Sequence, residues 1–187
     1  SVGWQGIFMI LLFIGILLGI GCIRFKESLP AEKRSKTGVW ATFRSFGIIV
    51  HNRRYMLYVF QLAFAQGILF AYIASSPFII QQHYGFSPFA FSICFAVNAV
   101  AIGVAAALSV KFRRTENGTL TGCVGMLVFA VLQMAALYSG CGFWTYELLM
   151  FALLFMMGLT FTASTTLAMD CERRYAGAAS ALLGALC

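Results

Sequence analysis

Six long apolar blocks dominate this sequence and limit its fold more than any other feature. A helix needs roughly 20 apolar residues to cross the hydrocarbon core of a bilayer, and the blocks approach or reach that length. Only 10% of the residues are charged, whereas a soluble domain carries about 25%. We therefore predict an all-α membrane protein. The apolar blocks are Ile7–Ile23, Tyr55–Ile80, Phe86–Val110, Leu120–Leu137, Phe143–Met169 and Ala176–Cys187.

The two ends of the chain indicate a piece of a longer protein. The sequence opens at Ser1 instead of an initiator Met, and its last apolar block, Ala176–Cys187, is cut short. We therefore expect a fragment with a truncated final helix, which does not transport by itself.

Positive charge is confined to alternate loops. All 13 Lys and Arg residues lie in the segments 24–54, 111–118 and 171–175, and the connections between these segments carry none. Basic residues favour the cytoplasmic side of short loops. We therefore predict that these three loops are cytoplasmic and that the N-terminus lies outside. The net charge of +7 then reports orientation in a lipid bilayer, and we expect no nucleic-acid partner.

The long first loop contains a second helical pattern. Pro30 prevents the first span from continuing, and apolar residues then recur near helical spacing from Val39 to Asn52. We predict a short helix in the cytoplasmic membrane interface, with a simple linker as the alternative.

The second apolar block carries a polar stripe. At 100° per residue, its members fall within about 100° of one another on a helix. Polar groups are costly to bury in a membrane, so such a stripe indicates either a wet cavity or hydrogen bonds between helices. The sequence leaves both alternatives open. The members are Gln61, Tyr72, Ser75 and Ser76.

The third and fifth apolar blocks add further candidates. Asn98 is a lone amide in the middle of its block, which could be a ligand contact or a structural hydrogen bond. Thr162 and Thr166 share a helix face with Phe151 and Phe155. Aromatic rings beside hydroxyls suit a lipophilic ligand with a few polar atoms. Alternatively, the threonines bond the carbonyl four residues earlier in their own helix.

Acidic residues lie near the ends of the apolar blocks. We expect Glu147 at the outer interface and Asp170 at the inner one to be solvated or ion-paired. A proton-coupled transporter usually needs a carboxyl inside the membrane, so we expect its main proton site outside this segment. The sequence has no cysteine pair or histidine at metal-ligand spacing and no enzyme or P-loop motif. We therefore expect no enzyme, metal or cofactor.

Four stretches carry a resemblance to a known family. They are Trp4–Phe8 with the later Lys26–Pro30, Phe70–Phe78 with Gln81 and Tyr84–Gly85, Phe91–Ala99, and Ala176–Ala185. In these stretches the chain resembles the major facilitator superfamily, and within it the Bcr/CflA-type drug:proton antiporters of bacterial inner membranes.

The resemblance implies a particular division of the chain. Residues 1–23 would be the last helix of an N-terminal half, and residues 24–54 the cytoplasmic loop between the halves. Residues 55–187 would be an incomplete C-terminal half. Its helices would lie at about 55–81, 86–110, 119–139, 143–170 and 176–187.

The resemblance also implies alternating access around a central site. The substrates would be small amphipathic molecules, the coupling ions protons, and the protein a monomer in the bacterial inner membrane. Alternatives are a superfamily transporter of a metabolite and, from another class, a membrane-embedded enzyme or assembly subunit. The candidate substrate-binding residues are Gln61, Tyr72, Ser75, Ser76, Asn98, Thr162 and Thr166.

Overall fold

A computed structural model describes residues 4–24, 39–112 and 114–187 of the chain. The chain divides into two units, Ser1–Gly38 and Val39–Cys187. The described element of the first unit is helix α1, Trp4–Arg24. No residue of its most apolar stretch is buried, so this helix presents apolar side chains on every described face.

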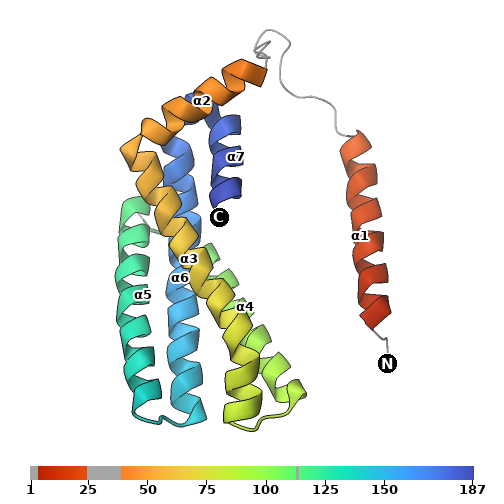
Figure 1. Cartoon of the computed structure of the whole chain (residues 1–187), viewed down its shortest axis with the longest axis vertical. Helices are drawn as coiled ribbons and strands as arrows, with labels where there is room; N and C mark the ends of the chain where they lie inside the picture. Colours follow the sequence, from red (N-terminus) through yellow and green to blue (C-terminus); the bar gives the residue numbers. More distant parts are fainter. Residues whose placement is uncertain (1–3, 25–38, 113) are drawn as a thin grey trace. The chain divides into compact units, whose positions relative to one another are not determined.

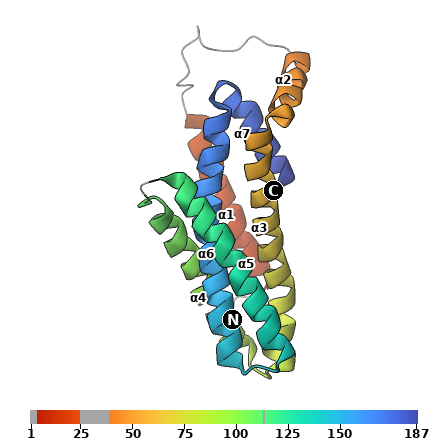
Figure 2. The same cartoon turned by 90° about the vertical axis from the view of Figure 1, so that its left-hand side faces the viewer.

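The second unit is a bundle of helices, and the described residues of the chain contain no strand. Figure 1 shows the helices running back and forth along one axis, and Figure 2 shows the same bundle from the side. This confirms the predicted all-α class. In chain order the elements are α2 (Val39–His51), α3 (Arg53–Pro77), the π-helix η2 (Phe78–His83), α4 (Pro88–Ser109), α5 (Thr115–Tyr138), α6 (Phe143–Cys171), the 3₁₀ turn η3 (Arg173–Tyr175) and α7 (Ala176–Leu186).

Five helices among the described residues are long and apolar enough to cross a membrane. The helix α7 is apolar but shorter. These helices support the multi-pass membrane character predicted from the apolar blocks. The spans run from Gln5 to Arg24, Arg53 to His83, Pro88 to Ser109, Thr115 to Tyr138 and Phe143 to Cys171.

Local capping explains where two of these helices begin. The side chain of Asn52 accepts hydrogen bonds from the backbone N–H groups of Arg54 and Tyr55, at 3.1 and 3.4 Å. This N-cap starts α3 at Arg53, two residues before the predicted start. Ser87 caps α4 in the same way, because its Oγ accepts from the Ala90 N–H at 3.2 Å.

Pro77 does not stop the second span. The chain continues as the π-helix η2, in which the Tyr84 N–H bonds the Ile79 carbonyl at 3.1 Å, five residues back. Wider turns of this kind occur as short segments that continue an α-helix. The span therefore reaches His83 instead of the predicted 81.

Helix α6 is the centre of the bundle. It packs against α3, α4 and α5, and half of its most apolar stretch is buried, against less than a quarter in each neighbour. Two glycines allow the closest approaches. A Cβ built on Gly158 would lie 2.5 Å from the carbonyl oxygen of Ile102 in α4, and one on Gly122 would lie 2.8 Å from that of Met156 in α6.

A cluster of buried residues joins α2, α3, α6 and α7 at one end of the bundle. Ile49, Tyr55, Val59, Ala168 and Ala179 form its core. The Tyr55 hydroxyl donates to the carbonyl oxygen of Ala179 at 2.7 Å. This contact fixes the start of α3 against the first turn of α7.

The Lys and Arg side chains that the structure describes in the second unit lie at the same end of the bundle. Because neighbouring helices alternate in direction, the start of α3, the end of α4, the start of α5 and the end of α6 lie together (Figure 1). Asn52 and Glu172 meet here, with an Nδ2–Oε1 distance of 2.6 Å. The described basic residues at this end are Arg53, Arg54, Lys111, Arg114 and Arg173.

Candidate functional site

Three helices meet at one amide in the interior of the bundle. Asn98 lies midway along α4, and its Nδ2 donates to the Tyr72 hydroxyl on α3 at 3.0 Å. The same nitrogen donates to Oε1 of Glu147 on α6 at 2.9 Å. We call Tyr72, Asn98 and Glu147 the Asn98 cluster. It joins α3 and α4 to the central helix α6 through side chains alone.

Two members of the Asn98 cluster are buried, and the third, Glu147, is partly buried. Asn98 is 0% exposed and Tyr72 is 4% exposed. Several polar atoms here are buried and have no hydrogen-bond partner among the described residues. Such atoms are few in proteins and usually have a structural or functional reason. They are Oδ1 of Asn98, Oε2 of Glu147, Oγ of Ser76 and the hydroxyl of Tyr146.

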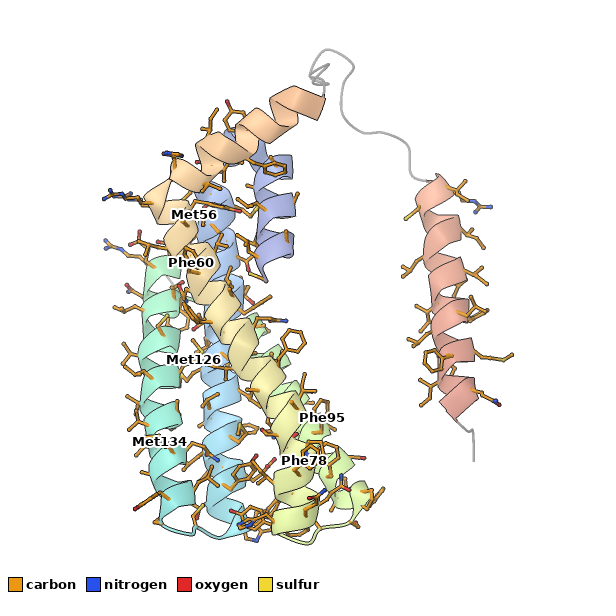
Figure 3. All side chains as sticks on the ribbon, in the orientation of Figure 1. Met56, Phe60, Phe78, Phe95, Met126 and Met134 are labelled. Carbon is orange, nitrogen blue, oxygen red and sulfur yellow. The ribbon has the colours of Figure 1, made fainter. Side chains whose placement is uncertain are left out.

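Aromatic rings form one wall of the Asn98 cluster. The ring of Tyr72 stacks on that of Phe95, with centroids 5.8 Å apart and planes at 9°. Phe91 follows one turn away, with its centroid 5.9 Å from that of Phe95. Figure 3 labels Phe95 in the lower part of the bundle, where α3 and α4 lie. The site therefore combines stacking surfaces with an amide, a hydroxyl and a carboxyl group.

The position of Glu147 differs from the prediction of an interfacial, solvated carboxylate. Its Oε2 is buried, and its Oε1 accepts from an amide midway along a neighbouring helix. Asp170 is ion-paired, as one of the two predicted alternatives, because its Oδ1 lies 3.0 Å from Arg173. That is the one ion pair in the part of the chain that the structure describes, and it lies at the far end of α6. The place of Asp170 at the inner interface stays a prediction.

The predicted polar stripe of α3 divides between two environments. Tyr72 belongs to the Asn98 cluster. The fully buried Ser76 lies one turn after Tyr72 on α3. Gln61 instead lines a groove between α3 and α5, together with Cys123 and Met126. Figure 1 shows the reason, since α3 crosses α6 from the α5 side to the α4 side. One straight stripe therefore faces two different neighbours.

Two of the remaining candidates have hydroxyls that bond carbonyls of their own helices. Ser75 donates to the Ala71 carbonyl at 2.7 Å, and Thr166 donates to that of Thr162 at 3.0 Å. Thr162 and Thr166 also line a groove beside Met169, toward the C-terminal end of α6, which is the end predicted to face the cytoplasm. The structure therefore brings Tyr72 and Asn98 together and places Gln61, Thr162 and Thr166 elsewhere.

The turn after η2 ties the opposite end of α3 to the start of α6. The Tyr84 hydroxyl donates to the Cys141 carbonyl at 2.9 Å, and the rings of Phe86 and Phe143 pack with centroids 4.2 Å apart. Burial and the nearby Cys141 raise the pKa of Tyr84 to about 12. The folded structure therefore favours the neutral, protonated form of the Tyr84 phenol. The Tyr84–Cys141 bond joins the end of the second span to the start of α6, the helix that carries Glu147.

Sequence reasoning missed Glu147, although a signal for it exists. Met150, Leu154 and Gly158 follow it at helical spacing and are buried. The carboxyl group therefore lies on the same side of α6 as its packed face. Among the described residues, no group of three or more His, Cys, Asp or Glu side chains is placed to hold a metal ion.

Comparison with known proteins identifies the class of this bundle. The family model of the Major Facilitator Superfamily matches residues 1–187, and the chain therefore belongs to that superfamily of membrane transporters and is not an enzyme. The chain is also 35% identical over 188 residues to an uncharacterised MFS-type transporter, YdgK, of Bacillus subtilis strain 168. The match covers 98% of this chain and 46% of YdgK, so the chain spans about half the length of that relative. No solved structure matches the chain.

Proposed function

We propose that the full-length protein is a secondary transporter that exports small amphipathic drugs in exchange for protons. This chain would supply the last helix of the N-terminal half, the loop between the halves and most of the C-terminal half. Family membership supports alternating access, in which two halves rock around a central site. We propose the Asn98 cluster as the contribution of this half to that site.

One observation carries the substrate class, namely the combination of chemical groups at the cluster. The stacked rings of Tyr72 and Phe95 offer a flat apolar surface, and the amide of Asn98 offers a hydrogen-bonding group beside it. Ligand sites of this kind bind molecules that are mostly apolar and carry a few polar atoms. The unpartnered oxygens of Asn98 and Ser76 would meet those polar atoms.

A charged metabolite would need different residues. No Lys or Arg side chain of the described residues contacts the Asn98 cluster through an ion pair or hydrogen bond. A sugar phosphate or carboxylate substrate would usually require such a cation. This difference favours the drug over the metabolite.

We further propose that the protein lies in the bacterial inner membrane as a monomer, with loops 24–54, 111–118 and 171–175 in the cytoplasm. The clustering of the described basic residues at one end of the bundle supports this orientation. Thr162 and Thr166 lie toward that end of α6. They would contact substrate when the site opens to the cytoplasm, whereas Tyr72 and Asn98 lie deeper.

The test uses the full-length gene in everted membrane vesicles. A pH gradient is established, amphipathic antibiotics are added one by one, and proton release is followed with a pH-sensitive dye. We expect release with some compounds, and none in vesicles without the protein. If correctly inserted protein releases no protons with any compound, drug:proton exchange is wrong and the metabolite transporter takes its place.

A further inference from the structure

The carboxyl group of Glu147 has an incomplete set of partners. A carboxylate can accept about four hydrogen bonds, but this one accepts a single bond, from Asn98, among the described residues. Its second oxygen is buried and receives none. An ionised group in this setting carries a charge that its surroundings barely stabilise, and binding a proton removes that charge.

The groups that face Glu147 do not supply a counter-charge. They are Tyr72 from α3, Cys94 from α4 and the adjacent Tyr146 of α6. Phenols and thiols are ordinarily neutral at physiological pH. Helix α5 also packs on α6, but its described titratable groups, Glu116 and Cys123, lie toward its opposite end, and Tyr138 is 96% exposed. Glu147 is therefore the group of this cluster whose charge can change at physiological pH.

The amide of Asn98 can satisfy either charge state. In the observed orientation, its NH₂ group donates both to the Glu147 carboxylate and to the Tyr72 oxygen. A half-turn of the amide places Oδ1 where Nδ2 was, and an oxygen with two lone pairs accepts two hydrogen bonds. It would then accept from a protonated Glu147 and from the Tyr72 hydroxyl. Each protonation state thus has a matching amide orientation.

We propose that Glu147 is a proton-binding residue of this transporter, and that Asn98 passes its protonation state to Tyr72 by turning its amide. A proton from the aqueous side adds to the carboxylate oxygen that faces Asn98, giving a neutral carboxyl group. Deprotonation returns the same proton to water on the side to which the site is then open. No other bond forms or breaks.

The exchange changes what Tyr72 offers to a substrate. When Glu147 is ionised, the Tyr72 oxygen accepts from Asn98, and its own hydrogen is free to bond an acceptor on the substrate. When Glu147 is protonated, that hydrogen is used by Asn98. Proton and substrate therefore compete through Asn98 without touching each other, which is the requirement of an antiporter. This inference rests on the proposed function for its role in export, but proton binding itself needs no substrate.

Infrared difference spectroscopy tests the proposal on the purified full-length protein in lipid. Spectra at low and high pH are subtracted, and the C=O stretch of a protonated carboxyl group is followed. We expect this band in the wild type and in Glu116→Gln, which alters an exposed carboxylate. We expect Glu147→Gln to remove the band. Glu147→Asp should shift its frequency, which assigns the band even if Glu147→Gln folds poorly.

The coupling through Asn98 has its own readout. A tyrosine band that is lost in Tyr72→Phe should change together with the carboxyl band in the wild type. In Asn98→Ala the carboxyl band should persist while the tyrosine band no longer responds to pH. If the tyrosine band still follows pH in folded Asn98→Ala, the relay is wrong.

The spectra separate this proposal from drug export. A carboxyl band that persists at full size in folded Glu147→Gln, or a wild type without any such band, overturns proton binding at Glu147 whatever the vesicle assay shows. A band assigned to Glu147 in a protein that releases no protons with drugs upholds the proton site and overturns the substrate class.

Discussion

Substituting Gly158 by Ala tests the packing that holds the Asn98 cluster together. The added Cβ would lie 2.5 Å from the Ile102 carbonyl oxygen and 2.9 Å from the Ala105 Cβ. The Ile102 oxygen belongs to the backbone of α4, so it cannot move aside as the end of a flexible side chain could. A carbon–oxygen contact needs about 3.3 to 3.6 Å, so α4 must retreat from α6 by about 1 Å.

That retreat has a cost and a structural consequence. Overpacking of this kind costs about 1–3 kcal/mol, and the better helix propensity of Ala returns up to about 1 kcal/mol. Asn98 lies one turn before Ile102 on α4, and its bond to Glu147 is 2.9 Å long. A movement of about 1 Å takes this distance beyond the range of a hydrogen bond.

The assay is thermal unfolding of the full-length protein in detergent, followed by intrinsic fluorescence. We expect Gly158→Ala to melt below the wild type. The control is Gly103→Ala on α4, where a Cβ would meet nothing within 4 Å, so its melting temperature should be unchanged or higher. A Gly158→Ala protein that melts at or above the wild-type temperature would refute the close α4–α6 contact.

Other predictions use the same melting assay. Tyr55→Phe removes the bond to the Ala179 carbonyl and should cost about 1 kcal/mol, and a melt equal to wild type would show that this bond adds nothing. Asn52→Ala removes the N-cap of α3 and should cost about 1 kcal/mol, whereas Asn52→Ser, which keeps a capping oxygen without placing a second carboxylate against Glu172, should lose less. The pKa of Tyr84 is raised to about 12, so the fold favours the neutral phenol. Its stabilising contribution is complete below the ordinary value near 10 and is lost as the pH rises through 12. Tyr84→Phe should therefore flatten the pH dependence of melting between these values, and an unchanged profile would contradict the assignment.

The apolar blocks predicted the helices because each block is long enough to cross a bilayer on its own. The described helices follow these blocks, and the differences have local causes. Asn52 and Ser87 cap helices through single side-chain oxygens. After Pro77 the helix continues as the π-helix η2, a change that the hydrophobicity of the sequence does not reveal.

The candidate site was harder to predict than the helices. Helical spacing correctly placed Tyr72 on a polar stripe, but a stripe does not reveal which neighbour it faces where helices cross. Counting depth along α6 alone predicts an interfacial Glu147. Tilted helices bring different levels together, so a residue one turn into α6 reaches the middle of α4. Such contacts depend on the packing angle, which no single segment encodes.

The most direct test of the account is the structure of the full-length protein in a lipid nanodisc, determined by electron cryomicroscopy. The account predicts the Asn98 amide within hydrogen-bond distance of both the Tyr72 hydroxyl and the Glu147 carboxyl group, inside the bundle and at the level of the membrane. A Glu147 side chain that points to the headgroups, with Asn98 bonded elsewhere, would contradict it.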